Sequence, residues 1–122
     1  MAGAIVEITP VQEAKAILRF IREGNEFVRM ESLIRVMSEN DLKPEEIGST
    51  KEELRALFIA DCKFVIRRDL AHWRTSYGIR SPGEKCFAEG VVDSLKVGKL
   101  DYAEFGISDI EMRYIKQAAG LR

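Results

Sequence analysis

The longest helical pattern in the chain covers residues 51–77, and it constrains the fold more than any other feature. Thr50 and Glu53 form the Ser/Thr-x-x-Glu sequence of a capping box, which predicts a helix start at this point. Over residues 54–66, apolar side chains fall on nearly every face of the predicted helix. Helices of this kind are usually packed on several sides. We therefore predict that this helix is the central element of the fold.

Two shorter helical patterns precede this run. Thr9 and Pro10 suit the N-cap and the first position of a helix, and Gly24 suits its end. The apolar residues between them recur at three- and four-residue spacing, which indicates one buried helical face. Asn25 can cap a second helix, whose apolar stripe covers residues 27–37. Both patterns are typical of short helices on a globular core.

The chain after the long run contains two more helical patterns. Residues 84–95 carry apolar side chains four positions apart. Ser108 and Glu111 form a second capping box, which predicts a last helix reaching the C-terminal residues. Residues 42–50 are predicted to be a loop or a single turn, because Pro44 and Gly48 interrupt them, and Gly98 and Gly106 bracket a short segment at residues 99–105.

These patterns predict an all-α fold: a compact bundle of about five helices around one long central helix. We find neither an internal repeat nor a linker long enough to separate domains, so residues 1–122 are expected to form a single helical domain. Residues 1–8 contain a short β-branched segment, which could form an edge strand or an extended arm.

Composition restricts the classes of function. Hydrophobic residues make up 46% of the 122 residues, so a core can form without disulfides or metal. The chain has 19 basic and 20 acidic residues, and its formal net charge of -1 disfavours a general nucleic-acid binder. The N-terminus has no basic region ahead of an apolar run, and no stretch approaches the ~20 apolar residues of a membrane span. We expect a cytoplasmic protein with no membrane partner.

Metal and cofactor sites are not indicated. Cys62 and Cys86 are the only cysteines, and both lie within apolar helical patterns, which is typical of buried reduced thiols. His72 is the only histidine, so a zinc site would lack ligands at a usable spacing. The sequence also has no glycine-rich phosphate loop. We expect no cofactor.

Residues 93–104 resemble an EF-hand calcium loop in part. The first, sixth, eighth, ninth and twelfth positions match: Asp93, Gly98, Leu100, Asp101 and Glu104. The resemblance implies that carboxylates of this segment could ligate calcium. The third and fifth positions, however, are Leu95 and Val97, which offer no side-chain oxygen. These two residues favour packing beneath a turn over calcium binding.

Residues 99–116 resemble a helix-turn-helix motif in part, with Gly106 at the turn. The position four residues before this glycine is usually small, but here it is Tyr102. The second helix would open with Asp109 and Glu111, which place carboxylates where a recognition helix meets phosphates. This segment therefore disfavours sequence-specific DNA binding.

Arginine and aromatic residues gather in the second half of the long helix and just beyond it. The candidate binding residues are Arg67, Arg68, His72, Trp73, Arg74 and Arg80. Arginine forks beside aromatic faces can hold phosphate, RNA or an acidic protein segment. The alternative interpretation is structural: Trp73 continues the apolar stripe of the core, and the arginines form the solvated back of the helix.

Asp61 is the polar residue to watch, because it lies in the most apolar part of the chain. If it is buried, it needs a partner, and a structural ion pair is the simplest one. A catalytic acid would need a second polar group nearby, and the sequence shows none. His72 has no serine or cysteine nucleophile at a readable spacing. An enzyme is therefore the less expected class.

Three hypotheses of function remain. The leading one is a non-catalytic module that binds another protein or associates with itself as a homodimer, because the chain has many apolar residues for its length. The first alternative is nucleic-acid or anion binding through the basic face of the long helix. The second alternative is a small enzyme or ligand-binding domain that uses Asp61, Cys62 and His72.

Overall fold

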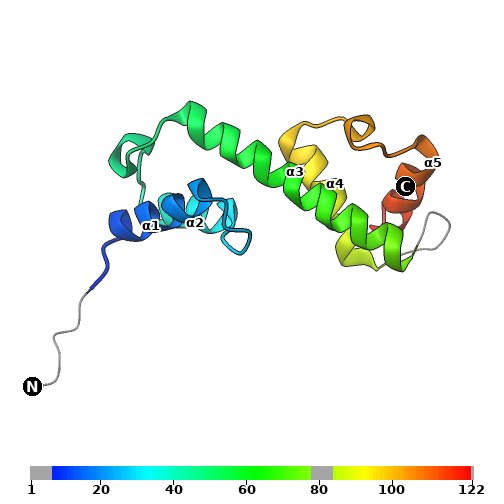
Figure 1. The fold of residues 1–122 in the computed structure, drawn as a ribbon, viewed down its shortest axis with the longest axis horizontal. Coiled ribbons are helices and arrows are strands. Elements are labelled where there is room, and N and C mark those ends of the chain that lie inside the picture. Colours follow the sequence, from blue (N-terminus) through cyan, green and yellow to red (C-terminus); the bar gives the residue numbers. More distant parts are fainter. Residues whose placement is uncertain (1–6, 78–83, 122) are drawn as a thin grey trace, which may run out of the picture. The chain divides into compact units, whose positions relative to one another are not determined.

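The computed structural model describes residues 7–77 and 84–121, and every regular element in these ranges is helical (Figure 1). Five α-helices and two 3-10 helices follow in the order α1 (Pro10–Arg22), α2 (Met30–Glu39), η1 (Pro44–Ile47), α3 (Lys51–Ser76), α4 (Lys85–Gly98), η2 (Tyr102–Phe105) and α5 (Asp109–Ala118). The predicted all-α fold of about five helices is confirmed. Most of the possible N-terminal strand, residues 1–6, lies outside the described residues, and residues 7–9 have no regular structure.

The contacts within the chain fall into two compact units, residues 1–58 and 59–122, which are described separately below. Helix α3 contributes to both. Its first turns place Leu54, Leu57 and Phe58 against the core of the first unit, whereas Ile66 and Leu70 belong to the core of the second. Two different cores therefore account for the apolar residues on so many faces of this helix. The single-domain organisation stays a prediction.

In the first unit, α1 and α2 pack against each other and η1 packs against α1. Their inward-facing residues form one core: Ala14, Leu18, Met30, Leu33, Val36 and Ile47. The predicted start of α1 is confirmed: Pro10 is the first helical residue, and the hydroxyl of Thr9 accepts the N–H of Gln12. The Gln12 side chain in turn accepts the N–H of Thr9, which completes a capping box.

Helix α2 begins later than predicted. Asn25 does not cap it, because the Asn25 side chain accepts the N–H of Phe27 at 2.9 Å and so stabilises a local turn. The helix starts at Met30, after Arg29, which makes no side-chain capping bond. Phe27 therefore lies in the preceding loop, where 94% of its surface is exposed. Its predicted place on the apolar stripe of α2 is wrong.

In the second unit, the second half of α3 packs with α4, η2 and α5 around a core of its own. The buried residues of this core are Ile66, Leu70, Trp73, Ala88, Val91, Leu95, Ile107, Met112, Ile115 and Ala119. Gly90 lies so close to α3 that a methyl group there would overlap the carboxylate of Asp69. The absence of a side chain at Gly90 thus permits the close approach of the two helices.

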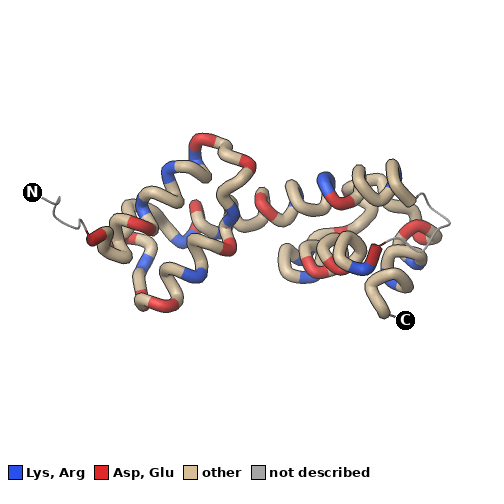
Figure 2. The backbone as a smooth tube through the Cα atoms, turned by 90° about the horizontal axis from the view of Figure 1, so that it is seen from below, with Lys and Arg blue, Asp and Glu red and all other residues tan. Residues whose placement is uncertain are grey.

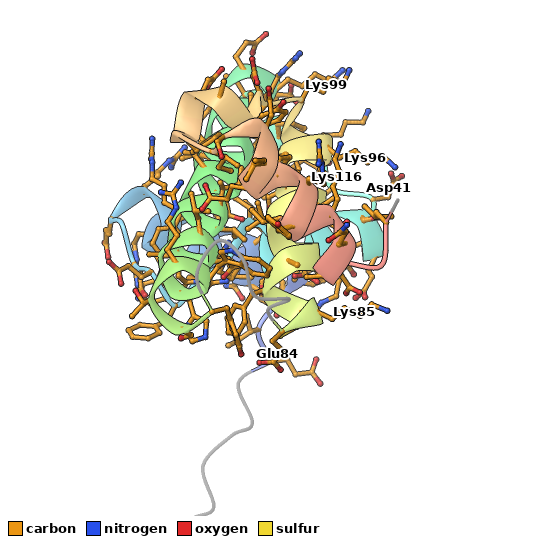
Figure 3. All side chains as sticks on the ribbon, turned by 90° about the vertical axis from the view of Figure 1, so that its right-hand side faces the viewer. Asp41, Glu84, Lys85, Lys96, Lys99 and Lys116 are labelled. Carbon is orange, nitrogen blue, oxygen red and sulfur yellow. The ribbon has the colours of Figure 1, made fainter. Side chains whose placement is uncertain are left out.

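Helix α4 extends through Gly98, three residues past the predicted end. Lys99 ends it with a left-handed backbone (φ 52°), and Figure 3 shows Lys96 and Lys99 on and just beyond its last turn. The first half of the EF-hand-like segment therefore belongs to α4, and Leu95 is buried. In the described part of the chain, no three His, Cys, Asp or Glu residues gather as a metal site would need.

The cysteines differ from the sequence-based expectation in part. Cys62 is buried, as predicted, but Cys86 is exposed near the start of α4, so its predicted burial is wrong. Neither cysteine forms a disulfide. Within residues 7–77 and 84–121, no helix combines the length and the apolar character that crossing a membrane requires.

Candidate functional site

Arg74 and Glu111 form a charged pair with two hydrogen bonds in the second unit. The Arg74 Nε and Nη2 atoms donate to the two Glu111 carboxylate oxygens at 2.9 and 2.6 Å, and Nη2 also donates to the Gly106 carbonyl at 2.9 Å. The hydrogen bond to Glu111 raises the pKa of Arg74. Glu111 is only 2% exposed, so its carboxylate is desolvated in the folded chain, and the guanidinium of Arg74 compensates its charge.

The first unit contains the same arrangement. The Arg22 Nε and Nη2 atoms donate to Glu53 at 3.0 and 2.5 Å, and Nη2 donates to the Gly48 carbonyl at 3.0 Å. Ser49 adds a hydroxyl bond to the same carboxylate at 2.5 Å. The bonds from Arg22 and Ser49 lower the pKa of Glu53 to about 2.

The backbone around the two pairs is repeated as well. Gly48 and Gly106 follow the 3-10 helices η1 and η2 with φ of 73° and 69°. Asp41 and Lys99 precede them, each by seven residues, with φ of 49° and 52°. We found no internal repeat in the sequence, because few equivalent positions share a residue. The structure shows that the two units nevertheless repeat one local geometry.

Only one of the two hydrogen bonds of a capping box forms at Thr50 and at Ser108, where capping boxes were predicted. Each hydroxyl accepts the N–H of the glutamate three residues later, Glu53 or Glu111, at 3.1 Å. The glutamate carboxylates do not return to the cap, because they accept from an arginine of an earlier helix. A signal for this was present in the sequence: Gly-x-Ser/Thr-x-x-Glu occurs at both places. We interpreted it as local capping and missed the long-range pairs.

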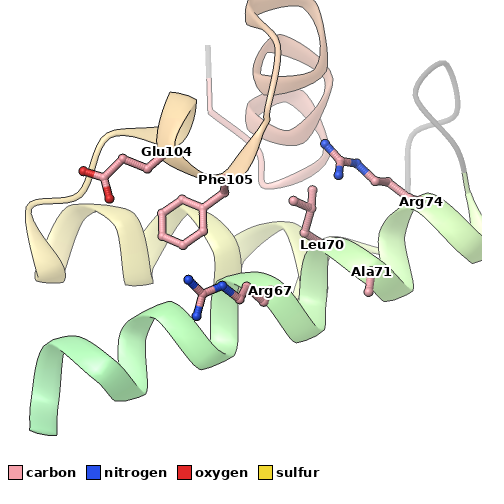
Figure 4. Close-up of a pocket in the computed structure, with 6 residues that line it drawn as sticks. All are labelled: Arg67, Leu70, Ala71, Arg74, Glu104 and Phe105. Atoms are coloured by element: carbon pink, nitrogen blue, oxygen red, sulfur yellow. The ribbon is translucent and has the colours of Figure 1, made fainter.

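A pocket of about 310 Å³ opens beside the Arg74–Glu111 pair (Figure 4). We call it the Arg67 pocket. It is lined by Arg67, Leu70, Ala71, Arg74, Glu104 and Phe105. The four residues from α3 are spaced by three, four and seven positions, so they share one face of the helix. Glu104 and Phe105 come from η2 and form the opposite wall. The volume is at the lower end for ligand pockets.

Arg67 is the distinctive charge of this pocket. Its guanidinium lies over the Phe105 ring, 5.7 Å from the ring centroid, as Figure 4 shows. Arg67 makes neither a hydrogen bond nor an ion pair with any described residue, whereas Arg74 is held by Glu111. One arginine of the pocket is therefore locked in place, and the other keeps its hydrogen-bond donors available.

The remaining candidate residues of the long helix do not line the pocket. Arg68 donates to Asp69 at 3.1 Å and lies over Phe64. The His72 ring stacks on Phe87 with 3.9 Å between centroids. Trp73 is a core residue with 1% exposure, as the structural interpretation expected. Arg80 lies outside the described residues.

Asp61 is half-buried on α3 and has an interaction partner. The acidic residues that the structure buries are others, Asp69 and Glu111, and sequence reasoning did not select either as a buried charge. Asp61 and His72 are eleven residues apart on one helix, which separates them by roughly 16 Å along its axis. None of Asp61, Cys62 and His72 lines the Arg67 pocket.

Comparisons of the chain with known protein families, with curated protein sequences and with solved structures found no match. The chemistry of the described residues is therefore the basis for any functional conclusion. Figure 2 shows that acidic and basic residues are interspersed along both units.

Proposed function

We propose that the chain is a non-catalytic interaction module that binds another protein through the Arg67 pocket. The observation that carries this proposal is the contact between Arg67 and Phe105, an arginine without a carboxylate partner on an incompletely buried aromatic ring. Arginine and aromatic residues in partly apolar depressions are enriched among the residues that dominate binding energy in protein interfaces.

The charges near the pocket favour a protein over a nucleic acid. Binding to a phosphate backbone draws on several uncompensated cations. On this helix, however, Arg68 is next to the buried carboxylate of Asp69, and Arg74 is neutralised by Glu111. The exposed carboxylate of Glu104 adds a negative charge at the pocket itself. Nucleic-acid or anion binding is therefore the weaker alternative.

An enzyme that uses Asp61, Cys62 and His72 is the weakest alternative. The axial distance of roughly 16 Å between Asp61 and His72 prevents both from touching one substrate atom. His72 is further engaged by its stacking on Phe87.

Selection of displayed random peptides on the immobilised full chain tests the proposal. We expect enrichment of peptides that bind the wild type and Phe27→Ala equally, and bind Phe105→Ala at least about tenfold more weakly. Phe27 is the matched control, since it is an exposed aromatic residue of the other unit. Amide NMR shifts on peptide addition should map to the pocket residues. Absence of enrichment, or shifts confined to the first unit, would overturn the proposal.

A labelled oligonucleotide at low salt tests the nucleic-acid alternative. We expect no change in its fluorescence anisotropy on addition of the chain. Binding that weakens steeply as salt is added would favour the alternative and contradict the protein-binding proposal.

Self-association would use a different surface from the Arg67 pocket. The exposure of Phe27 supports it, because burying this aromatic side chain against a second copy would remove apolar surface from water and so favour a dimer. Light scattering coupled to size-exclusion chromatography should then give a mass that rises with concentration, and Phe27→Ser should abolish the rise. A constant monomer mass would contradict self-association and leave binding to another protein in place.

We also propose a cytoplasmic location, where both cysteines stay reduced. Partial desolvation and the nearby Glu84 raise the pKa of the Cys86 thiol, so the protonated, less reactive form prevails at neutral pH. Alkylation of the thiols in freshly lysed cells checks this. A disulfide through Cys86 in the cell would contradict it.

A further inference from the structure

We infer that the Arg67 pocket takes an acidic segment of its partner, with one carboxylate on Arg67 and an adjacent apolar side chain against Leu70 and Phe105. This inference rests on the proposed function and specifies the chemistry of the partner.

The carboxylate follows from the state of Arg67. Its guanidinium presents several N–H donors in one plane, and within the described part of the chain none of them is bonded. A carboxylate matches this fork with two parallel hydrogen bonds. The Phe105 ring holds one face of the guanidinium and leaves its edges open to such a partner.

The states of Arg74 and Glu104 indicate that the bound group carries a single negative charge. Arg74 uses Nε and Nη2 for Glu111 and Gly106, so its charge is already compensated. Glu104 repels a second anion from the same pocket. One singly charged group therefore fits better than a phosphate, which carries up to two charges and would face Glu104 with a single free arginine.

The apolar neighbour follows from the remaining walls. Leu70 forms the buried floor, and Ala71 and Phe105 flank it. A volume of about 310 Å³ admits one large side chain with its backbone, but not a helix. The partner therefore contributes one large side chain at this point.

The first unit supplies a matched control within the same molecule. Lys15 lies seven residues before Arg22, as Arg67 lies seven before Arg74. The residue equivalent to Phe105 is Ile47, which is 2% exposed and offers no aromatic wall. A charge reversal at Lys15 therefore changes the net charge as Arg67→Glu does, without touching the pocket.

The display selection provides the first readout. We expect enriched peptides to carry Asp or Glu next to a large apolar residue. Enrichment of peptides without an acidic residue would overturn this inference while leaving the proposed function intact. No enrichment at all would overturn the proposed function, and the inference with it.

Fluorescence anisotropy with an enriched peptide and its variants gives the second readout. Replacing the acidic residue by its amide should weaken binding about tenfold or more, the usual effect of losing a charge-assisted pair. Arg67→Glu should reverse the preference, so that a lysine-containing peptide binds better than the acidic one. Lys15→Glu should leave the order of the peptides unchanged.

Three results of the binding measurements would also overturn the inference. The first is equal binding of the acidic peptide and its amide variant. The second is an unchanged preference in Arg67→Glu that shows the same circular dichroism and melting temperature as the wild type. The third is a phosphoserine peptide that binds more than about tenfold tighter than the carboxylate peptide, which would assign the pocket to phosphopeptides.

Discussion

Arg74 donates two hydrogen bonds to Glu111 across 37 residues of sequence, at 2.9 and 2.6 Å. The pair joins α3 to the first turn of α5, and a third bond to the Gly106 carbonyl fixes the turn between η2 and α5. The same arginine borders the Arg67 pocket. The stability of the second unit and the shape of its pocket are therefore linked through one side chain.

Glu111→Gln should lower the free energy of unfolding by about 1–3 kcal/mol. The substitution removes the negative charge that compensates Arg74, and the partial exposure of Arg74 keeps the loss below that of a fully buried pair. Urea denaturation followed by circular dichroism measures the loss. Glu104→Gln, at an exposed position nearby, should change stability by less than about 0.5 kcal/mol. Equal effects of the two substitutions would contradict a structural role for the pair.

Stability should depend on pH through Glu53. The pKa of this carboxyl is about 2 in the folded chain, against an ordinary value of 4.5. A lowered folded pKa gives stability that is complete above pH 4.5 and is lost as the pH falls toward 2. Urea midpoints measured between pH 5 and pH 2 should fall less steeply in Glu53→Gln than in the wild type. Glu52→Gln, which changes the neighbouring exposed residue, should retain the wild-type slope.

Gly90→Ala should destabilise the second unit by about 1–3 kcal/mol, because the new methyl group overlaps the Asp69 carboxylate. The effect should depend on Asp69. In an Asp69→Ala background, the same substitution should be neutral or stabilising by up to about 1 kcal/mol, since alanine is the better helix former. A double-mutant cycle on the unfolding free energies measures this coupling. Additive effects would show that the two helices do not meet at Gly90.

Lys99→Gly should raise the free energy of unfolding by about 0.5–1 kcal/mol. Lys99 ends α4 in the left-handed region at φ 52°, where a side chain is unfavourable and glycine is not. Lys96→Gly, one turn earlier within α4, should have the opposite sign and cost up to about 1 kcal/mol. Thermal melts of both variants check the prediction. Destabilisation by both would contradict the left-handed end of α4.

The helices could be predicted from local signals. Thr9 and Pro10 marked the start of α1, and the pattern over residues 51–77 marked α3. The predicted helix ends were wrong where a side chain or the backbone formed a different local interaction. Asn25 bonds the Phe27 N–H instead of capping a helix, and α4 continues to Gly98, past its predicted end at residue 95. Such choices differ by about 1 kcal/mol or less, which the local sequence does not resolve.

The candidate site was predicted only in part. Arg67 and Arg74 were selected because they share a helix with aromatic residues. Glu104 and Phe105, thirty or more residues away, were not selected for this site, although they form the opposite wall. Their position depends on how η2 packs against α3. The hydrogen bonds from Arg74 to Gly106 and Glu111 hold the residues after η2 beside this helix.

The sequence by itself determined the helices, because periodicity and capping act within a few residues of chain. It also contained the Gly-x-Ser/Thr-x-x-Glu segments at Gly48 and Gly106. Only the tertiary structure decided which arginine reaches each glutamate. Arg22 and Arg74 bind glutamates that lie 31 and 37 residues further along the chain. At such separations the packing of the helices determines which residues meet, and local sequence patterns do not predict the contact.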